Sequence, residues 1–265
     1  MNGTGGGPPF APIAGVVVVV PVHDEQDLLP ACLRSIHAAL EHPLVRPLPS
    51  TVVVVLDDCH DASAAIVADL ARPGDRVVVT RHRNVGLARR AGAAVGLGVV
   101  AGDRRSVWLA NTDADTTVPR HWLARQLGFA AACDAVAGVV RVRDWSPHRR
   151  STRLAFDRSY RTSPLRPHPH VHGANLGVRA SAYLSVGGFP ALAHSEDHAL
   201  WRSLRDAGHT VRPVRRVWVT TSARREGRAV HGFADRLVRL EDEVRLDDRR
   251  APLRRRVALE PDPVG

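Results

Sequence analysis

Two aspartates separated by one residue, Asp113 and Asp115, are the side chains in this sequence best suited to chemistry. They follow the apolar residues 107–110, and a continuous run of this kind is typical of a strand covered on both faces. The aspartates therefore fall where the strand leaves the sheet, which is the edge where open α/β sheets bind ligands. Two carboxylates on a short turn suit a Mg²⁺ or Mn²⁺ ion that also takes oxygens from a diphosphate. The simpler interpretation is a solvated turn, because aspartate is common in turns.

Polar turns also follow other strands predicted in the first half of the chain. Besides the strand that begins at residue 107, strands are predicted at residues 15–22, 51–56, 76–80 and 135–142. Helical segments separate them, and this alternation predicts an α/β fold with a mostly parallel central sheet and helices on both faces. Because the carboxyl ends of parallel strands lie at one edge, we expect the polar turns to gather there and form a site.

The second half of the chain is less regular and carries another acidic pair, Glu196 and Asp197. This pair begins a predicted helix whose N-cap is Ser195. Acidic residues in a first helical turn also complement the helix dipole, so the pair has a purely structural interpretation as well. Two further short strands are predicted at residues 211–214 and 217–220.

Composition restricts the class of protein. A chain of 265 residues with 44% hydrophobic and 24% charged residues is ordinary for a soluble globular protein. Its three cysteines have no metal-type spacing, so we expect free thiols in a reducing, cytoplasmic compartment. The longest apolar run, near residues 16–20, is too short to span a membrane and follows no basic segment.

The formal net charge is +10, and arginine carries all of the positive side-chain charge because the sequence contains no lysine. Such a charge indicates either an anionic partner or a compositional bias toward arginine. Few aromatic residues are interleaved with the arginine clusters, so we expect no nucleic-acid partner. Peripheral contact with an anionic membrane surface stays open.

Two common nucleotide-binding loops are absent from the sequence. The turn after the first strand is not glycine-rich, which argues against a dinucleotide-dependent oxidoreductase, and no P-loop is present. What remains is a sheet edge with carboxylates and a later acidic pair. These residues are suited to a metal-held nucleotide diphosphate and a general base.

The order of these motifs over about residues 15–205 resembles family 2 of the glycosyltransferases with the GT-A fold. The matching segments are the Pro-Val-x-x-Glu of Pro21 to Glu25, the acidic turn of Asp57 to Asp61, Asn84 to Gly92, the Asp-x-Asp of Asp113 and Asp115, Gly187-Gly188-Phe189, and Glu196-Asp197. The resemblance lies in the sequence of several motifs, which makes it more specific than any single one.

The resemblance implies a role for each matching residue. Pro21, His23, Glu25 and either Asp57 or Asp58 would line the base pocket, and Arg89 would help to hold the nucleotide. Asp113 would approach the ribose and contribute to the metal site, and Asp115 would ligate the cation. Gly188 would allow the backbone to approach the substrate closely. Asp197 would be the general base, with Glu196 as second choice.

The implied reaction is a metal-dependent, inverting transfer of a single sugar from a nucleotide sugar, with UDP favoured, to an unidentified acceptor hydroxyl. The Gln-x-x-Arg-Trp motif of processive synthases is missing, so polymer synthesis is not expected. His23, Cys59-His60 and Arg90 depart from the usual family pattern, which leaves the base and the sugar open. A retaining transferase similar to glucosyl-phosphoglycerate synthases and a non-catalytic nucleotide- or polyanion-binding module are the alternatives.

The predicted organisation is one GT-A domain at residues 15–246. Residues 15–116 form its nucleotide-sugar half and residues 117–246 its acceptor half. We expect residues 1–14, rich in glycine and proline, to be a disordered lead-in, and residues 247–265 to be a mobile arginine-rich tail.

Overall fold

The computed structural model describes residues 10–160, 168–228 and 232–257, and the side chains of these residues except 159–160 and 247–257. The strands are β1 (Gly15–Val22), β2 (Ser50–Asp57), β3 (Arg76–Thr80), β4 (Val107–Asn111), β5 (Thr116–Thr117), β6 (Ala135–Val142), β7 (Leu176–Arg179) and β8 (Val211–Thr221). The α-helices are α1 (Leu29–Leu40), α2 (Ser63–Leu70), α3 (Val85–Val99), α4 (Trp122–Ala130), α5 (Arg150–Tyr160), α6 (Ala180–Ser185), α7 (Glu196–Asp206) and α8 (Phe233–Val257), and η1 (Arg104–Ser106) and η2 (Gly173–Asn175) are short 3₁₀ turns.

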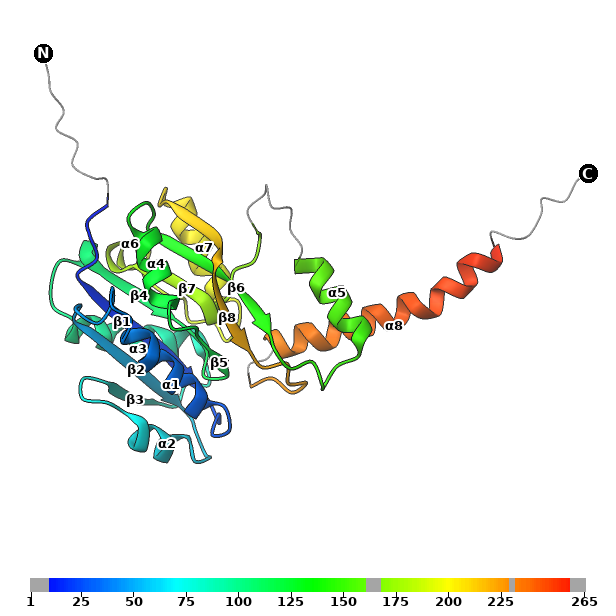
Figure 1. Ribbon diagram of the computed structural model, residues 1–265, viewed down its shortest axis with the longest axis horizontal. Helices are drawn as coiled ribbons and strands as arrows, with labels where there is room; N and C mark the ends of the chain where they lie inside the picture. Colours follow the sequence, from blue (N-terminus) through cyan, green and yellow to red (C-terminus); the bar gives the residue numbers. More distant parts are fainter. Residues whose placement is uncertain (1–9, 161–167, 229–231, 258–265) are drawn as a thin grey trace, which may run out of the picture. The chain divides into compact units, whose positions relative to one another are not determined.

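The strands form one eight-stranded sheet in the order β3-β2-β1-β4-β7-β6-β8-β5 (Figure 1). The first four strands in this order are parallel, whereas β7 is antiparallel to both of its neighbours. Strands β6 and β8 are parallel, and β5 is antiparallel to β8. The predicted α/β architecture with a mostly parallel sheet is therefore confirmed, and the carboxyl ends of β1, β2 and β4 lie at the same edge.

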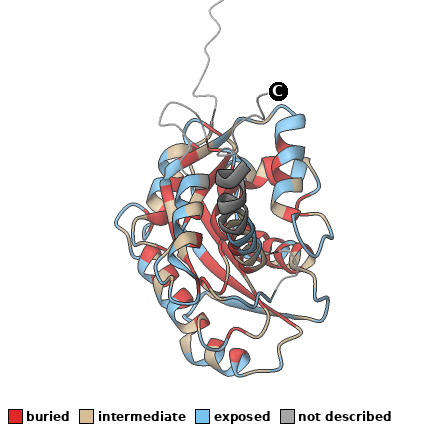
Figure 2. Cartoon of the chain, turned by 90° about the vertical axis from the view of Figure 1, so that its right-hand side faces the viewer, coloured by how far each residue is buried: buried red, intermediate tan, exposed pale blue. Residues whose placement is uncertain are grey.

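The valine run of β1 forms the centre of the core. All five residues from Val16 to Val20 are 0% exposed, and since successive strand residues point to opposite faces, both faces of the sheet are covered. Figure 2 shows this burial along the central strands. On one face, α3 approaches closely because it carries Gly92 and Gly96. A Cβ atom at Gly92 would lie 2.6 Å from the Val19 side chain, so only glycine permits this contact.

The second half of the sheet differs from the sequence-based expectation in three strands. Strands β5 and β7 were not predicted, because a two-residue and a four-residue strand carry too little periodicity to be recognised. The two strands predicted at residues 211–214 and 217–220 are one continuous strand, β8. Its pairing with β6 is irregular, since Val214 pairs with Gly138 and Trp218 with Val139. A bulge of this kind interrupts the alternation, and the sequence then resembles two strands.

The contacts within the chain divide it into two compact units. The first comprises residues 1–142 and 167–222 and contains the whole sheet, and the second comprises residues 143–166 and 223–265 with α5 and α8. Within the second unit, the buried His148 contacts Glu241 at 3.0 Å and the Ala223 carbonyl at 2.9 Å.

The two predicted terminal segments are partly outside the described residues. Of the lead-in, the described part ends at Ala14, whose amide donates to the Ser106 carbonyl at 2.7 Å. Helix α8 continues to Val257, so the backbone is helical for the first part of the segment predicted to be a mobile tail. Among the described helices, none is both long and apolar enough to cross a lipid bilayer.

Candidate active site

Helix α3 brings the strand-end turns of the first unit together. Its N-cap is Asn84, whose side chain accepts a hydrogen bond from the Leu87 amide at 3.0 Å. The Asn84 amide in turn donates to Asp57 Oδ2 at 3.0 Å, which fastens the start of the helix to the end of β2. One turn further along, Arg89 extends from α3 toward the turn that follows β4.

Arg89 joins the two acidic motifs of the sequence. Its side chain is 2% exposed; Nη2 donates to Asp113 Oδ1 and Nε donates to Glu196 Oε1 at 3.1 Å. The guanidinium also lies over the Phe189 ring, 5.7 Å from its centroid. Burial alone would lower the pKa of Arg89, but the charges of Asp113, Glu196 and Asp197 outweigh it and raise that pKa. A permanently charged arginine is therefore held between the carboxylates.

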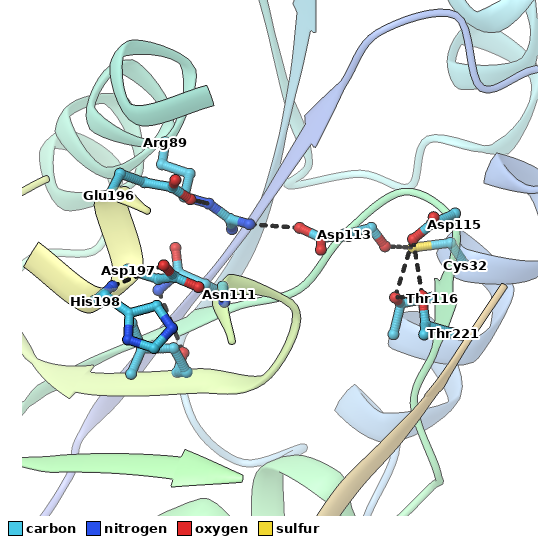
Figure 3. Close-up of polar contacts among 12 residues, drawn as sticks. Cys32, Arg89, Asn111, Asp113, Asp115, Thr116, Glu196, Asp197, His198 and Thr221 are labelled. Atoms are coloured by element: carbon cyan, nitrogen blue, oxygen red, sulfur yellow. Dashed lines mark hydrogen bonds and ion pairs between the residues drawn. The ribbon is translucent and has the colours of Figure 1, made fainter. Parts of the chain in front are cut away.

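Glu196 and Asp197 begin helix α7, but their surroundings differ. Glu196 is buried, and this burial, which outweighs the attraction of Arg89, raises the pKa of its carboxyl to about 7. Asp197 is half-buried. Its Oδ2 accepts the Gly173 amide at 2.7 Å and its Oδ1 accepts the His198 amide at 2.7 Å. Figure 3 shows Asp197 beside the Arg89–Glu196 pair. Asp197 is more accessible than the buried Glu196.

Asp115 lies on the other side of Asp113 from Arg89 in the view of Figure 3. Its Oδ1 accepts hydrogen bonds from the hydroxyls of Thr116 and Thr221, both at 3.2 Å. Cys32 supports the same turn from α1, because its Sγ donates to the Asp113 carbonyl at 3.3 Å. Burial, followed by the charges of Asp115 and Asp113, raises the pKa of the Cys32 thiol well above its usual range, so the thiol stays protonated as a donor.

The residues of this turn fit a divalent cation whose remaining ligands come from a substrate. The Asp113 side chain is 38% exposed and Asp115 is half-buried, so both can present oxygen to a ligand. In the described part of the chain, no group of three or more histidine, cysteine, aspartate or glutamate residues could hold a metal ion by itself. Mg²⁺ and Mn²⁺ are commonly bound through one or two carboxylates together with substrate phosphates.

Asp57 lies at the same edge, but its carboxylate serves the protein itself. Oδ1 accepts from the Thr80 hydroxyl at 2.9 Å and the His82 amide at 2.6 Å, and Oδ2 accepts from Asn84. Burial acts to raise the pKa of Asp57, but these hydrogen bonds outweigh it and lower the pKa. Three of its about four acceptor positions are occupied, so Asp57 shapes the loop between β3 and α3 and keeps one position for a ligand.

The other residues predicted for the base pocket gather around the ends of β1 and β2. Pro21 pairs with Val55 in the sheet, and His23 donates from Nδ1 to the Asp57 carbonyl at 2.7 Å. Asp58 has a positive φ of 55°, which turns its carboxylate to within 3.6 Å of Arg83 Nε. Glu25 is buried, and its backbone amide donates to the Ser63 hydroxyl at 3.0 Å.

Gly188 packs against Tyr183. It has a φ of 74°, and a Cβ atom there would lie 2.6 Å from the Tyr183 ring, so the close approach at Gly188 is to Tyr183. The neighbouring Phe189 carbonyl accepts from Arg90 Nε at 2.7 Å. The Gly-Gly turn therefore supports α3, and through the Phe189 ring it supports Arg89.

Sequence reasoning missed several residues that shape this site. The Gly173 amide donates to Asp197, and the hydroxyls of Thr116 and Thr221 donate to Asp115. Asp24 accepts the His60 amide at 2.6 Å between the first two turns. Thr221 had no signal in the sequence, because it follows Asp115 by 106 positions. Asp24 could have been found, since it lies inside the Pro-Val-x-x-Glu segment.

The sequence from residue 17 to residue 186 matches the profile of Glycosyl transferase family 2. The chain belongs to this family. Figure 3 therefore shows the part of a family 2 glycosyltransferase domain where the Asp-x-Asp turn and the later acidic pair meet. No curated protein matches the chain.

Solved structures of GT-A glycosyltransferases are similar in fold. The mannosyltransferase PcManGT from Pyrobaculum calidifontis, solved with GDP-Man and Mn²⁺, has a TM-score of 0.61 at 22% identity, covering 84% of this chain and 62% of that one. S. aureus TarS (residues 1–349), solved with UDP, has a TM-score of 0.59 at 15% identity, covering 80% of this chain and 61% of that one. This chain thus spans less than two thirds of either structure.

Proposed function

We propose that the chain transfers a single sugar from a nucleotide-diphosphate sugar to an acceptor hydroxyl, with a divalent cation and with inversion at the anomeric carbon. The observation that carries this proposal is the contact of Arg89 with both Asp113 and Glu196. It brings the proposed metal turn and the proposed general base to one edge of the sheet, as a transfer reaction requires.

Asp197 is the proposed general base. The amides of Gly173 and His198 fix its orientation, and a carboxylate offers about four acceptor positions, so some remain for the proton of an acceptor hydroxyl. Deprotonation would make the hydroxyl oxygen a stronger nucleophile as it attacks the anomeric carbon from the face opposite the leaving diphosphate. Glu196 faces Arg89 and is buried, so we assign it to positioning.

Asp115 and Asp113 would hold a Mn²⁺ or Mg²⁺ ion, and such an ion would offset the negative charge on the departing diphosphate. The hydroxyls that bind Asp115 Oδ1 orient the carboxylate for this purpose. We favour UDP as the nucleotide. TarS was solved with UDP and PcManGT with GDP-Man, so both nucleotides belong in the test.

The test is transfer or hydrolysis across a panel of UDP- and GDP-sugars with Mn²⁺, combined with calorimetric binding of the donor. Asp197→Asn should nearly abolish transfer and retain donor binding, whereas Asp115→Ala should lose donor binding. Asp206→Asn is a matched control, because Asp206 lies exposed at the end of the same helix as Asp197. Full activity of both site variants would refute the assignment.

Two other functions give different results in the same experiments. A retaining transferase of the same fold would give a product with the anomeric configuration of the donor, which NMR of the product distinguishes. A non-catalytic module would show salt-dependent binding to RNA or anionic lipid and no binding to UDP or GDP with Mn²⁺.

A further inference from the structure

We infer that Thr221 is a positioning residue for Asp115, and that the final strand of the sheet thereby completes the metal turn. The inference rests on the proposed role of Asp115 as a metal ligand. Thr221 lies outside residues 17–186, which match the family profile, and outside every motif named in the sequence analysis.

The contacts form a closed triangle of side-chain oxygens. Thr221 Oγ1 and Thr116 Oγ1 each lie 3.2 Å from Asp115 Oδ1, and the two hydroxyls lie 3.1 Å apart. The contact between the two hydroxyls uses only one of their two protons, so the other proton is available to Asp115 Oδ1. Both threonines are buried, Thr116 at 0% and Thr221 at 8% exposed, so water competes little for these hydrogen bonds.

The sheet explains why a residue so distant in sequence reaches the turn. Strand β5 begins directly after Asp115 and pairs antiparallel with the end of β8, with Thr116 opposite Thr221. Cross-strand neighbours in an antiparallel pair have Cβ atoms about 5 Å apart, which allows their hydroxyls to meet. The same pairing thus ends the sheet and fixes the carboxylate that precedes β5.

Hydrogen bonds to one oxygen of a carboxylate restrict the direction of the other. With Oδ1 bound to Thr116 and Thr221, rotation of the Asp115 carboxylate is limited, and Oδ2 is presented in a defined orientation. Groups that orient a metal ligand in this way typically change metal affinity by about 10–100-fold when they are removed. A threonine pair that served only the sheet would instead affect stability alone.

The experiment measures Mn²⁺ affinity of the full chain by electron paramagnetic resonance titration, with UDP and separately with GDP. Thr221→Val removes the hydroxyl at nearly constant volume, and we expect Mn²⁺ binding to weaken about tenfold or more. Thr221→Ser retains the hydroxyl and should restore the affinity. Thr220→Val is the matched control: the neighbouring side chain points to the opposite face of the strand, and the contact of its carbonyl with Thr117 is kept.

Thermal unfolding of each variant shows whether a loss of affinity follows from a loss of folding. Weakened Mn²⁺ binding by a folded Thr221→Val, with wild-type affinity in Thr221→Ser and Thr220→Val, supports the inference. Unchanged affinity in Thr221→Val, while Asp115→Asn abolishes binding, overturns the inference and leaves the proposed function intact. If the wild-type protein binds no Mn²⁺ with either nucleotide, the proposed metal-dependent function itself is refuted.

Discussion

Arg89→Leu tests the central contact of the site through the stability of the protein. The substitution keeps an apolar side chain over Phe189 but leaves the buried Glu196 without its positive partner. Removing one member of a buried ion pair costs about 3–5 kcal/mol, because the remaining charge is left uncompensated in a poorly solvated position. Glu196, 6% exposed at its side chain, should account for most of this cost, whereas Asp113 is 38% exposed and is solvated instead.

The loss should depend on pH with a definite sign. Burial raises the pKa of Glu196 from 4.5 to about 7, so the folded state holds its proton more tightly than the unfolded state. The carboxyl therefore favours folding below about pH 4.5, and this contribution disappears as the pH rises through 7. In Arg89→Leu the neutral form of the Glu196 carboxyl is favoured further. The variant should therefore lose little stability at pH 5.5, where this carboxyl is neutral, and the full cost of the uncompensated charge at pH 8.5.

Urea unfolding of both proteins at pH 5.5 and 8.5 measures this difference. Arg90→Leu is the matched control, because Arg90 is exposed, contacts only backbone carbonyls among its described partners, and should lose about 1 kcal/mol at either pH. In the double variant Arg89→Leu/Glu196→Gln, much of the loss at pH 8.5 should be recovered. Equal losses at the two pH values, or no loss at pH 8.5, would refute this account of the Arg89–Glu196 pair.

Three further predictions concern the base, the core and the second unit. The rate of sugar transfer should rise as the pH passes through about 7, because Glu196 ionises beside Asp197 in this range. In a pH–rate profile, Glu196→Gln should remove this rise. An unchanged inflection in Glu196→Gln would exclude Glu196 as its source. Gly96→Ala should lower the free energy of unfolding in urea by about 1–3 kcal/mol, because its Cβ would overlap Val17. Gly98→Ala, whose Cβ would have nothing within 4 Å, should raise that free energy by about 0.5–1 kcal/mol. A less stable Gly98→Ala than Gly96→Ala would contradict the packing of α3. His148→Leu should cost about 1–3 kcal/mol by leaving the Ala223 carbonyl without this donor, while Glu241 Oε2 keeps its hydrogen bond from Arg225. Hydrogen exchange in α5 and α8 should accelerate, and unchanged exchange would show that these bonds do not hold the second unit together.

Several features of this protein were predictable from local sequence alone. The valine runs of β1 and β2 predict buried parallel strands, because only a strand covered on both faces accommodates continuous apolar residues. The position of Asp113 and Asp115 after an apolar run places them at the carboxyl edge of the sheet. The order of the motifs then predicts the glycosyltransferase family, which the match over residues 17–186 confirms.

The environment of each carboxylate was decided only by the tertiary structure. Asp57 and Asp58 are adjacent in sequence, yet Asp57 accepts three hydrogen bonds from the end of β3 and the loop after it, whereas Asp58, at a positive φ, pairs with Arg83. Glu196 and Asp197 are likewise adjacent, yet one is buried against Arg89 and the other stays accessible. The hydrogen bond from Thr221 to Asp115 depends on the pairing of β5 with β8. Periodicity and motif order reflect interactions between near neighbours in the chain, but solvation and hydrogen bonding depend on residues that only folding brings into contact.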